Sequence, residues 1–232
     1  MTFAAYAERR SRLKTYFDAT AVKAWAQLTS DAPVSRIRET VRAGRDRMRA
    51  TLLAWLPDRL SGVRVLDAGC GAGQLAVEAA RRGAAVTAVD IAGNLVELAR
   101  QRAPSELKGR IEFRVGDLLD PALGSFDHAV AMDSLIHYAV DDVVRALATL
   151  APRVGRSMVF TFAPRTPALS LMHAAGKLFP KADRAPAIEP VTEARLRAGL
   201  TRELAASGWE IGRTERVVSG FYTSQALELV RR

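Results

Sequence analysis

The spacing of the hydrophobic residues changes near residue 62 of this 232-residue chain. Before that point, apolar residues recur every three or four positions among arginines, over Ala4–Phe17 and again over Val34–Leu56. This periodicity predicts two amphipathic helices, because it places the apolar side chains on one face of each helix. Pro57 follows the second segment directly and favours a helix end there. We expect residues 1–60 to form an N-terminal helical arm.

After residue 62, short apolar runs alternate with segments of helical periodicity. The predicted strands are Val63–Leu66, Ala85–Val89, Ile111–Val115, His128–Met132, Ser157–Phe162, Trp209–Val218 and Tyr222–Val230. The predicted helices are Gln74–Arg82, Asn94–Arg102, Asp141–Leu150 and Thr192–Ser207. Such alternation indicates parallel strands joined by crossover helices. Residues 61–232 are therefore expected to form one α/β domain, with a mostly parallel seven-stranded sheet and helices on both faces.

One long segment, residues 164–190, departs from this alternation. It holds five of the ten prolines, large apolar residues such as Phe179, and the basic residues Arg165 and Lys177. A long connection inside a compact domain is usually a lid or a binding element. The composition suits a flat hydrophobic molecule that carries carboxylates; the alternative is a structural helix with proline-rich flanks.

The charge and the cysteine content narrow the possible classes of protein. The chain holds 34 Lys and Arg against 25 Asp and Glu, and the first 60 residues carry +6 of the net charge of +9. Clustered cations suit a nucleic acid, an anionic membrane or an acidic partner, and equally a solvated helix face. The single cysteine, Cys70, excludes a disulfide framework within one chain. No segment approaches the ~20 apolar residues of a membrane span, so we expect a cytoplasmic protein.

The strongest local signal is a glycine-rich loop, Asp67-Ala68-Gly69-Cys70-Gly71-Ala72-Gly73, between a predicted strand and a predicted helix. A dinucleotide-binding loop would have a small residue where this chain has Gln74. An acid at the end of the strand, Asp67, is also unfavourable beside a diphosphate, whereas it is favourable beside an ammonium and a sulfonium group. The loop resembles the first motif of the Rossmann-like class I S-adenosylmethionine-dependent methyltransferases.

Two further acids lie at the ends of the next two predicted strands. Asp90 is placed to accept hydrogen bonds from both ribose hydroxyls. Asp117 is placed to accept a hydrogen bond from the adenine amino group. We therefore predict S-adenosylmethionine as the cofactor, with no protein-bound metal. The predicted cofactor-binding residues are Asp67, Gly69, Cys70, Gly71, Gly73, Asp90, Ile91, Asp117, Leu118 and Asp133.

The segment Met132–Tyr138, after the fourth strand, bears on the methyl acceptor. It lacks the Asn/Asp-Pro-Pro-aromatic motif of enzymes that methylate amino groups of bases, which disfavours a nucleic-acid substrate despite the charge. His137 is placed to hold or deprotonate an oxygen acceptor, with a structural histidine as the alternative.

Several blocks together resemble the magnesium-protoporphyrin O-methyltransferases of bacteriochlorophyll synthesis, from about residue 13 to the C-terminus. These blocks are Tyr16-Phe17 with Trp25, Arg38–Arg45, Asp67–Gly73, Met132–Tyr138, Phe160–Pro167, Gly176–Pro180 and Gly220–Gln225. The resemblance implies methylation of one propionate of Mg-protoporphyrin IX, which gives the monomethyl ester and S-adenosylhomocysteine (SAH). It also implies Tyr16 and His137 as the catalytic pair. The expected substrate-binding residues are Tyr138, Arg165, Lys177 and Phe179.

The sequence is also compatible with other functions. A quinone or phenol O-methyltransferase would use the same fold with His137 as a true base, and a cofactor-binding scaffold would do no chemistry. An arginine within Arg38–Arg45 could reach the cofactor's methionine carboxylate, but an ordinary charged helix surface is the commoner explanation. The large porphyrin-binding subunit of magnesium chelatase and an anionic, photosynthetic membrane are the possible partners.

Overall fold

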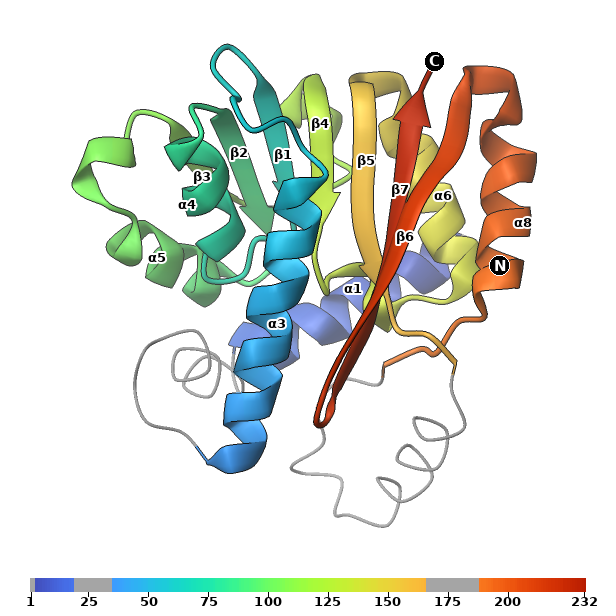
Figure 1. Ribbon diagram of the computed structural model, residues 1–232, viewed down its shortest axis with the longest axis horizontal. Helices are drawn as coiled ribbons and strands as arrows, with labels where there is room; N and C mark the ends of the chain where they lie inside the picture. Colours follow the sequence, from blue (N-terminus) through green and yellow to red (C-terminus); the bar gives the residue numbers. More distant parts are fainter. Residues whose placement is uncertain (1–2, 19–34, 166–187) are drawn as a thin grey trace.

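The computed structural model describes residues 3–18, 35–165 and 188–232 and contains one seven-stranded sheet (Figure 1). The strands are β1 (Arg64–Ala68), β2 (Ala85–Asp90), β3 (Ile111–Val115), β4 (Phe126–Ala131), β5 (Val154–Phe162), β6 (Trp209–Ser219) and β7 (Tyr222–Arg231). Their order across the sheet is β3-β2-β1-β4-β5-β7-β6. The first five strands are parallel, and β7 pairs antiparallel with both β5 and β6. This confirms the predicted fold class.

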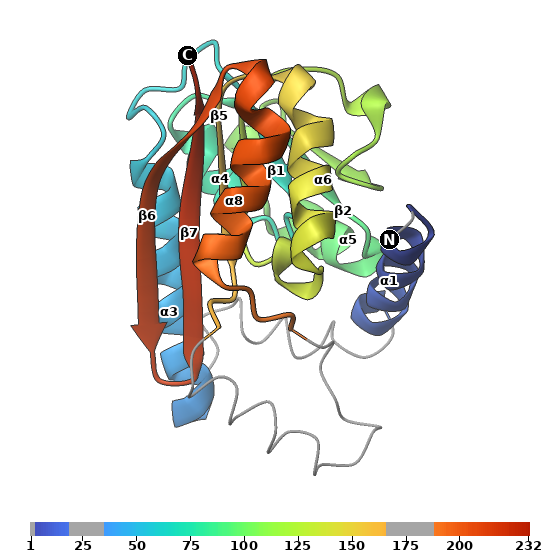
Figure 2. The same cartoon turned by 90° about the vertical axis from the view of Figure 1, so that its right-hand side faces the viewer.

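Helices cover both faces of the sheet, as Figures 1 and 2 show. On one face lie α3 (Arg36–Ala54), α4 (Gln74–Arg81) and α5 (Gly93–Arg102), and on the other lie α6 (Val140–Leu150) and α8 (Glu193–Leu204). Helix α1 (Phe3–Tyr16) crosses the end of the sheet at which the parallel strands finish. Ligands bind at this end of open α/β sheets, because the loops that follow the strands converge there.

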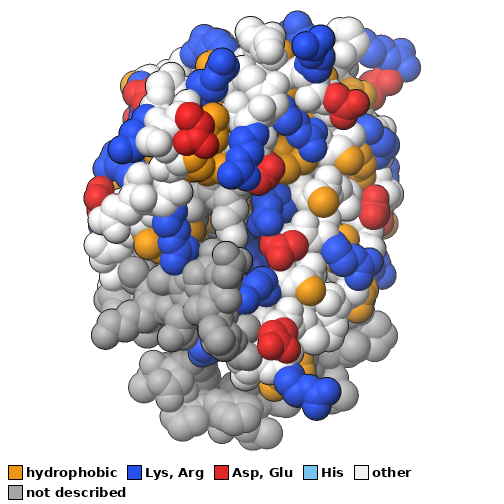
Figure 3. Space-filling view, turned by 60° about the vertical axis from the view of Figure 1, so that its left-hand side comes forward, with side chains coloured by type: hydrophobic (Ala, Val, Ile, Leu, Met, Phe, Trp, Pro, Cys, Tyr) orange, Lys and Arg blue, Asp and Glu red, His pale blue; other side chains and the backbone are white. Residues whose placement is uncertain are grey.

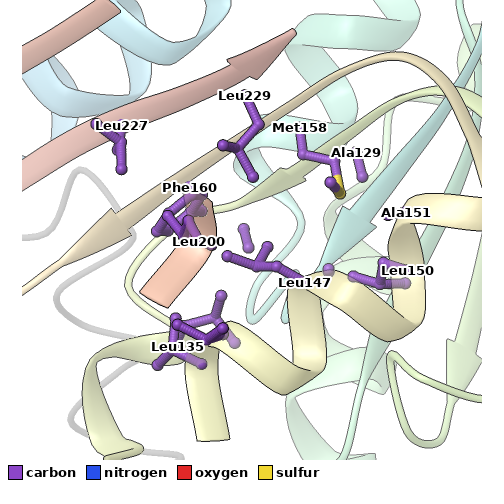
Figure 4. Packing of buried hydrophobic residues seen from close by; sticks show 14 of the residues in the cluster. Ala129, Leu135, Leu147, Leu150, Ala151, Met158, Phe160, Leu200, Leu227 and Leu229 are labelled. Carbon is purple, nitrogen blue, oxygen red and sulfur yellow. The ribbon is translucent and has the colours of Figure 1, made fainter. Parts of the chain in front are cut away.

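Two hydrophobic clusters hold these layers together. One lies between the sheet and helices α6 and α8, where fully buried Phe160 meets Leu147 and Leu200 (Figure 4). The other contains Met48 and Leu52 of α3 together with residues of β1 and α4. Helix α3 therefore belongs to the packed layers, and the predicted domain division at residue 60 stays a prediction.

Most predicted elements form within a few residues of the expected bounds. The clearest difference is β5, which begins at Val154 although the predicted strand began at Ser157. Exposed residues at 155 and 156 interrupt the apolar pattern there, and the pairing with β4 is irregular at this point, since Val154 pairs with Phe126 and Ser157 with His128. Nearly all of the predicted lid, residues 166–187, lies outside the described residues.

The surface carries charges of both signs. On the face shown in Figure 3, Lys and Arg side chains are interspersed with Asp and Glu and do not form one continuous basic patch. Among the described helices, none combines the length and the apolar character needed to span a bilayer.

Candidate active site

A cavity with about 990 Å³ of empty space opens at the carboxyl ends of β1, β2, β3 and β4. The glycine-rich loop forms one wall, the residues that follow β4 form another, and α1 and α3 supply side chains from the arm. This volume includes the open mouth of the cavity, and the lining runs along the carboxyl ends of four neighbouring strands.

The glycine-rich loop approaches the cavity closely because its backbone takes left-handed conformations. Gly69 has φ +87° and Gly71 has φ +52°, which L-residues with side chains rarely adopt. A Cβ on Gly69 would overlap Ser134, whereas a Cβ on Gly71 would meet no protein atom within 4 Å. The backbone N–H groups of Gly69 and Cys70 both donate to the carbonyl of Val89, which ties the loop to β2. Gly71 therefore leaves open space beside the loop.

Asp90 connects the glycine-rich loop to the end of β2. Its carboxylate accepts from the backbone N–H of Gly71 at 2.9 Å and of Ala92 at 2.9 Å. Burial raises its pKa, and these backbone donors oppose the shift. The carboxylate is thus held in a fixed orientation at the cavity wall, as the binding of two ribose hydroxyls requires.

Asp67 is the most deeply buried acid of the cavity, with 1% of its surface exposed. Its Oδ2 atom has no hydrogen-bond partner among the described residues. Burial, followed by the charge of Asp90, raises the pKa of Asp67 to about 7. A buried carboxylate in this state is stabilised by a nearby cation. The sulfonium and ammonium groups of S-adenosylmethionine would supply that charge.

Asp117 receives its contacts from the arm. Tyr6 donates its hydroxyl proton to Oδ1 at 3.0 Å, and Arg10 pairs with Oδ2. The backbone N–H of Leu119 also donates to Oδ1, at 2.9 Å. The Tyr6 ring stacks on Tyr138 with centroids 5.0 Å apart. Helix α1 therefore covers the end of the cavity predicted to hold adenine.

Asp133 lies at the opposite end of the cavity, after β4. It has φ +52°, the one positive value at a non-glycine residue in the described part of the chain. Its carboxylate accepts hydrogen bonds from Tyr222, Ser224 and Thr161, and it pairs with Arg45 at 2.6 Å. The side chain of Asp133 thus faces protein donors.

His137 and two aromatic residues line the wall predicted for the methyl acceptor. His137 is 8% exposed, and its ring meets the edge of Phe17 at a centroid distance of 5.9 Å. Arg9 donates to the backbone carbonyl of His137 at 2.7 Å and pairs with Glu189 at 2.8 Å. Phe17 and Tyr138 line the same cavity. The arm therefore completes this wall.

The structure brings most of the predicted site residues together. Those that line the cavity are Asp67, Gly69, Cys70, Gly71, Asp90, Ile91, Asp117, Leu118, Asp133, His137 and Tyr138. Gly73 instead packs at the start of α4, where a Cβ would press on Ala99 and Phe113. Tyr16 contacts Phe17 edge-on at 5.4 Å and is outside the cavity lining.

The expected substrate-binding residues are placed less completely. Arg165 is exposed and lies beyond the cavity wall, with its backbone N–H bonded to Val191. Lys177, Phe179 and Trp25 lie outside the described residues.

The sequence does not single out several cavity residues, most clearly Tyr6 and Arg49, and it leaves Arg45 between a cofactor contact and an ordinary helix surface. Tyr6 and Arg45 reach their partners across 111 and 88 positions of the chain. The only available signal was the resemblance that includes Arg38–Arg45, because helical periodicity shows which residues share a face and not where that face docks.

S-adenosylmethionine fits these residues. The unpartnered oxygen of Asp67 suits its cationic groups, Asp90 suits the ribose, and Asp117 suits the adenine amino group. Within the described residues, no cluster of His, Cys, Asp and Glu has the arrangement of a metal site.

Comparisons with known proteins agree with this geometry. Residues 131–231 match the family model described as magnesium-protoporphyrin IX methyltransferase C-terminus, and residues 65–154 match a methyltransferase domain. The chain is 49% identical to the magnesium-protoporphyrin O-methyltransferase of Rhodobacter capsulatus, over 96% of this chain and 97% of that protein. It is 32% identical to the chloroplastic magnesium protoporphyrin IX methyltransferase of Arabidopsis thaliana, over 94% of this chain and 70% of that protein.

A solved structure extends the similarity to three dimensions. The crystal structure of magnesium protoporphyrin IX methyltransferase from Synechocystis PCC 6803 with bound SAH matches with a TM-score of 0.83 and 30% identity. The match covers 96% of this chain and 99% of that one. Similarity over nearly the whole length, together with a cavity suited to S-adenosylmethionine, places this chain in the magnesium-protoporphyrin O-methyltransferase family.

Proposed function

We propose that this protein transfers a methyl group from S-adenosylmethionine to a propionate carboxylate of Mg-protoporphyrin IX, in (bacterio)chlorophyll synthesis. The products are the monomethyl ester and SAH. The observation that carries the proposal is the 49% identity to the magnesium-protoporphyrin O-methyltransferase of Rhodobacter capsulatus, along nearly the whole of both chains. The similarity includes residues 131–231, which extend well beyond the general methyltransferase domain.

The chemistry needs positioning more than proton transfer. A propionate has a pKa of about 4.3 and is already an anion at neutral pH. S-adenosylmethionine supplies a methyl group on a positively charged sulfur. One carboxylate oxygen forms the new C–O bond while the electron pair of the C–S bond stays on sulfur, so no proton moves. Holding two reactants in line can contribute about 7–11 kcal/mol.

His137 and Tyr16 are the residues we propose for this positioning. His137 lines the cavity, and Phe17 contacts both His137 and Tyr16, with centroid distances of 5.9 Å and 5.4 Å. The proposed role of the pair is to hold one carboxylate oxygen toward the methyl group. Helix α1, which covers the cavity through Tyr6 and Leu13, would exclude water during transfer.

Binding of the porphyrin itself is proposed for Tyr138, Arg165, Lys177 and Phe179. Tyr138 supplies a buried aromatic face beside His137. The other three belong to the expected lid, whose cations suit the propionates and whose apolar residues suit the ring.

A peripheral contact with an anionic membrane is also proposed. The side chains of Ile37, Val218 and Phe221 are each more than half exposed, at the start of α3 and at the tip of the β6–β7 hairpin. Exposed Arg36 and Arg38 flank Ile37, and cations beside apolar side chains favour anionic lipid. Salt-sensitive sedimentation with anionic vesicles would support the contact, and its absence would oppose it. The chelatase subunit stays a predicted partner.

The acceptor can be identified by comparing three substrates. Mg-protoporphyrin IX should be methylated, whereas its dimethyl ester, which has no carboxylate, and a quinol should not. At saturating S-adenosylmethionine, the rate with the porphyrin should be nearly independent of pH between 6 and 8, because the acceptor is ionised throughout. A phenolic acceptor, with a pKa of about 10, would give a rate that rises with pH. Methylation of the dimethyl ester or a preference for the quinol would contradict the proposal.

A further inference from the structure

Arg45 and Asp133 form an ion pair in the wall of the cavity that the transfer chemistry does not require. Arg45 Nη1 lies 2.6 Å from Asp133 Oδ2, and the two side chains are 18% and 5% exposed. Both residues line the cavity, Arg45 from α3 and Asp133 from the end of β4. The pair is therefore a charged and partly buried feature of the site itself.

The surroundings of Asp133 hold this pair in one geometry. Tyr222 donates to both carboxylate oxygens, at 3.1 and 3.2 Å, and Ser224 and Thr161 donate to Oδ1 at 3.1 and 3.2 Å. The Thr161 hydroxyl also accepts the backbone N–H of Asp133 at 2.7 Å. Buried polar groups that are fully satisfied make a network rigid.

The backbone at Asp133 adds to this specialisation. Its φ of +52° is unfavourable for a residue with a side chain, and strained residues of this kind cluster at ligand-binding sites. The turn also brings Ser134 against the glycine-rich loop, where its hydroxyl donates to the carbonyl of Ala68 at 2.7 Å. The turn that carries Asp133, the partner of Arg45, is thereby fixed beside the end of β1.

The order of the strands indicates what this arginine faces. Asp117 follows β3, Asp90 ends β2 and Asp67 lies in β1, and these three strands are neighbours in that order. Along the edge of the sheet, the acid suited to adenine therefore comes first, the acid suited to ribose second, and the acid suited to the cationic groups third. The next strand in that order is β4, which leads to Asp133 and Arg45. The cofactor has the same sequence of groups, and its methionine end carries a carboxylate. Among the described residues, the cations in the cavity lining are Arg45 and Arg49 of α3, and Arg45 is the one paired with Asp133.

We propose that Arg45 binds the α-carboxylate of the methionine part of S-adenosylmethionine. Asp133, with the hydroxyls of Thr161, Ser224 and Tyr222, is the positioning residue that holds the guanidinium at this place. A planar guanidinium is well suited to a carboxylate because it donates parallel hydrogen bonds. This inference rests on one part of the proposed function, the use of S-adenosylmethionine as methyl donor, and it does not depend on which molecule accepts the methyl group.

The experiment compares two ligands that differ only at the methionine end. SAH carries the amino acid carboxylate, whereas 5′-methylthioadenosine has the same adenosine and thioether without it. Isothermal titration calorimetry of Arg45→Gln should show SAH binding weakened roughly tenfold to a hundredfold. Binding of 5′-methylthioadenosine should stay within about twofold of the unsubstituted protein, a change worth about 0.4 kcal/mol. Arg36→Gln, an exposed arginine of the same helix, is the matched control and should change neither.

Asp133→Asn tests the positioning role, because asparagine tolerates a positive φ and keeps the shape of the side chain. We expect it to weaken SAH several-fold and to leave 5′-methylthioadenosine unchanged. Ser224→Ala removes one donor and should have the same selective effect on a smaller scale, which keeps the test usable if Asp133→Asn folds poorly.

Three outcomes would overturn the proposal. Equal losses of affinity for SAH and 5′-methylthioadenosine in Arg45→Gln would show that the ion pair has a purely structural role. Unchanged affinity for both ligands would show that Arg45 does not contact the cofactor. Unchanged SAH binding with a raised KM for the porphyrin would assign Arg45 to a substrate carboxylate instead. All SAH titrations are made without porphyrin, so a failure here is distinguishable from a failure of the proposed methyl transfer.

Discussion

Asp67 links the protonation state of the cavity to cofactor binding. Because its pKa is raised to about 7, the carboxyl is largely protonated below that pH and ionised above it. A bound sulfonium favours the ionised form, so cofactor affinity should rise as pH increases from 5.5 to 7. We expect a change in Kd for S-adenosylmethionine on the order of tenfold over this range. Titration calorimetry at several pH values measures it.

The matched variant for this prediction is Asp67→Asn, which keeps the size of the side chain and does not titrate. Its affinity should be lower at pH 7 and nearly constant between pH 5.5 and 7. If the variant and the unsubstituted protein showed the same pH dependence, another group would be responsible.

His137 is predicted to act on the transfer step and not on cofactor binding. Removing the ring in His137→Ala should lower kcat about 100-fold, because a misplaced acceptor loses the benefit of alignment. SAH affinity should be almost unchanged. His137→Gln retains a hydrogen-bond donor and should recover part of the rate. Equal losses of turnover and SAH affinity in His137→Ala would contradict the role.

Single residues differ in how far the sequence could predict their placement. Asp67 and Asp90 were predictable because each ends a strand whose apolar run is visible in the sequence. Tyr6 was not, although its helix was predicted, because its bond to Asp117 joins segments 111 positions apart. For the same reason, the sequence leaves Arg45 open between a contact with the cofactor's carboxylate and an ordinary helix surface. Contacts between distant segments depend on how elements dock, which local periodicity does not encode.

At the scale of elements, the glycine-rich loop offers a direct test of the cavity. Gly71 and Gly62 both have positive φ, and a Cβ on either would meet no protein atom within 4 Å. Gly71→Ala and Gly62→Ala should each lower the free energy of unfolding by about 1–2 kcal/mol, because alanine is strained in this conformation. Only Gly71→Ala should weaken SAH binding, since Gly71 lines the cavity and Gly62 does not.

Denaturant unfolding and calorimetry on the two variants separate strain from ligand contact. Equal SAH affinities in Gly71→Ala and Gly62→Ala would place the cofactor elsewhere in the cavity.

Element boundaries were more predictable than element contacts. Turns with glycine or proline mark most strand ends, and α4 begins at the predicted Gln74, directly after Gly73 in a left-handed conformation. The start of β5 differs from the prediction because Val154, ahead of two exposed residues, also pairs with β4 across an irregularity that the apolar pattern does not show.

At the scale of the whole molecule, a buried histidine makes stability depend on pH. His128 of β4 is 5% exposed, and its Nδ1 lies 2.7 Å from the Ser157 hydroxyl. Burial, with a smaller effect of Arg156, lowers its pKa below 6.5. The unfolded chain then binds more protons than the folded one just below pH 6.5. The free energy of unfolding should therefore fall as pH decreases from 6.5 toward the folded pKa.

His128→Asn removes this titration and keeps a polar partner for Ser157. Urea unfolding at pH 7.5 and 5.5 should show that the stability advantage of the unsubstituted protein over the variant shrinks at the lower pH. A difference that is the same at both pH values would contradict the assignment to His128.

The fold as a whole was predictable because one pattern, short apolar runs alternating with amphipathic helices, specifies a parallel sheet with two helical layers. The position of β7 between β5 and β6 was not, since a run of two final strands is compatible with more than one order.

The most direct test of the proposed function follows the methyl group itself. The protein is incubated with methyl-labelled S-adenosylmethionine and Mg-protoporphyrin IX, and the porphyrin is examined by mass spectrometry before and after mild alkali. We predict one labelled methyl per porphyrin, released by alkali as expected for an ester, and far less label with His137→Ala. An unlabelled porphyrin, or a label that resists alkali, would contradict transfer to a propionate carboxylate.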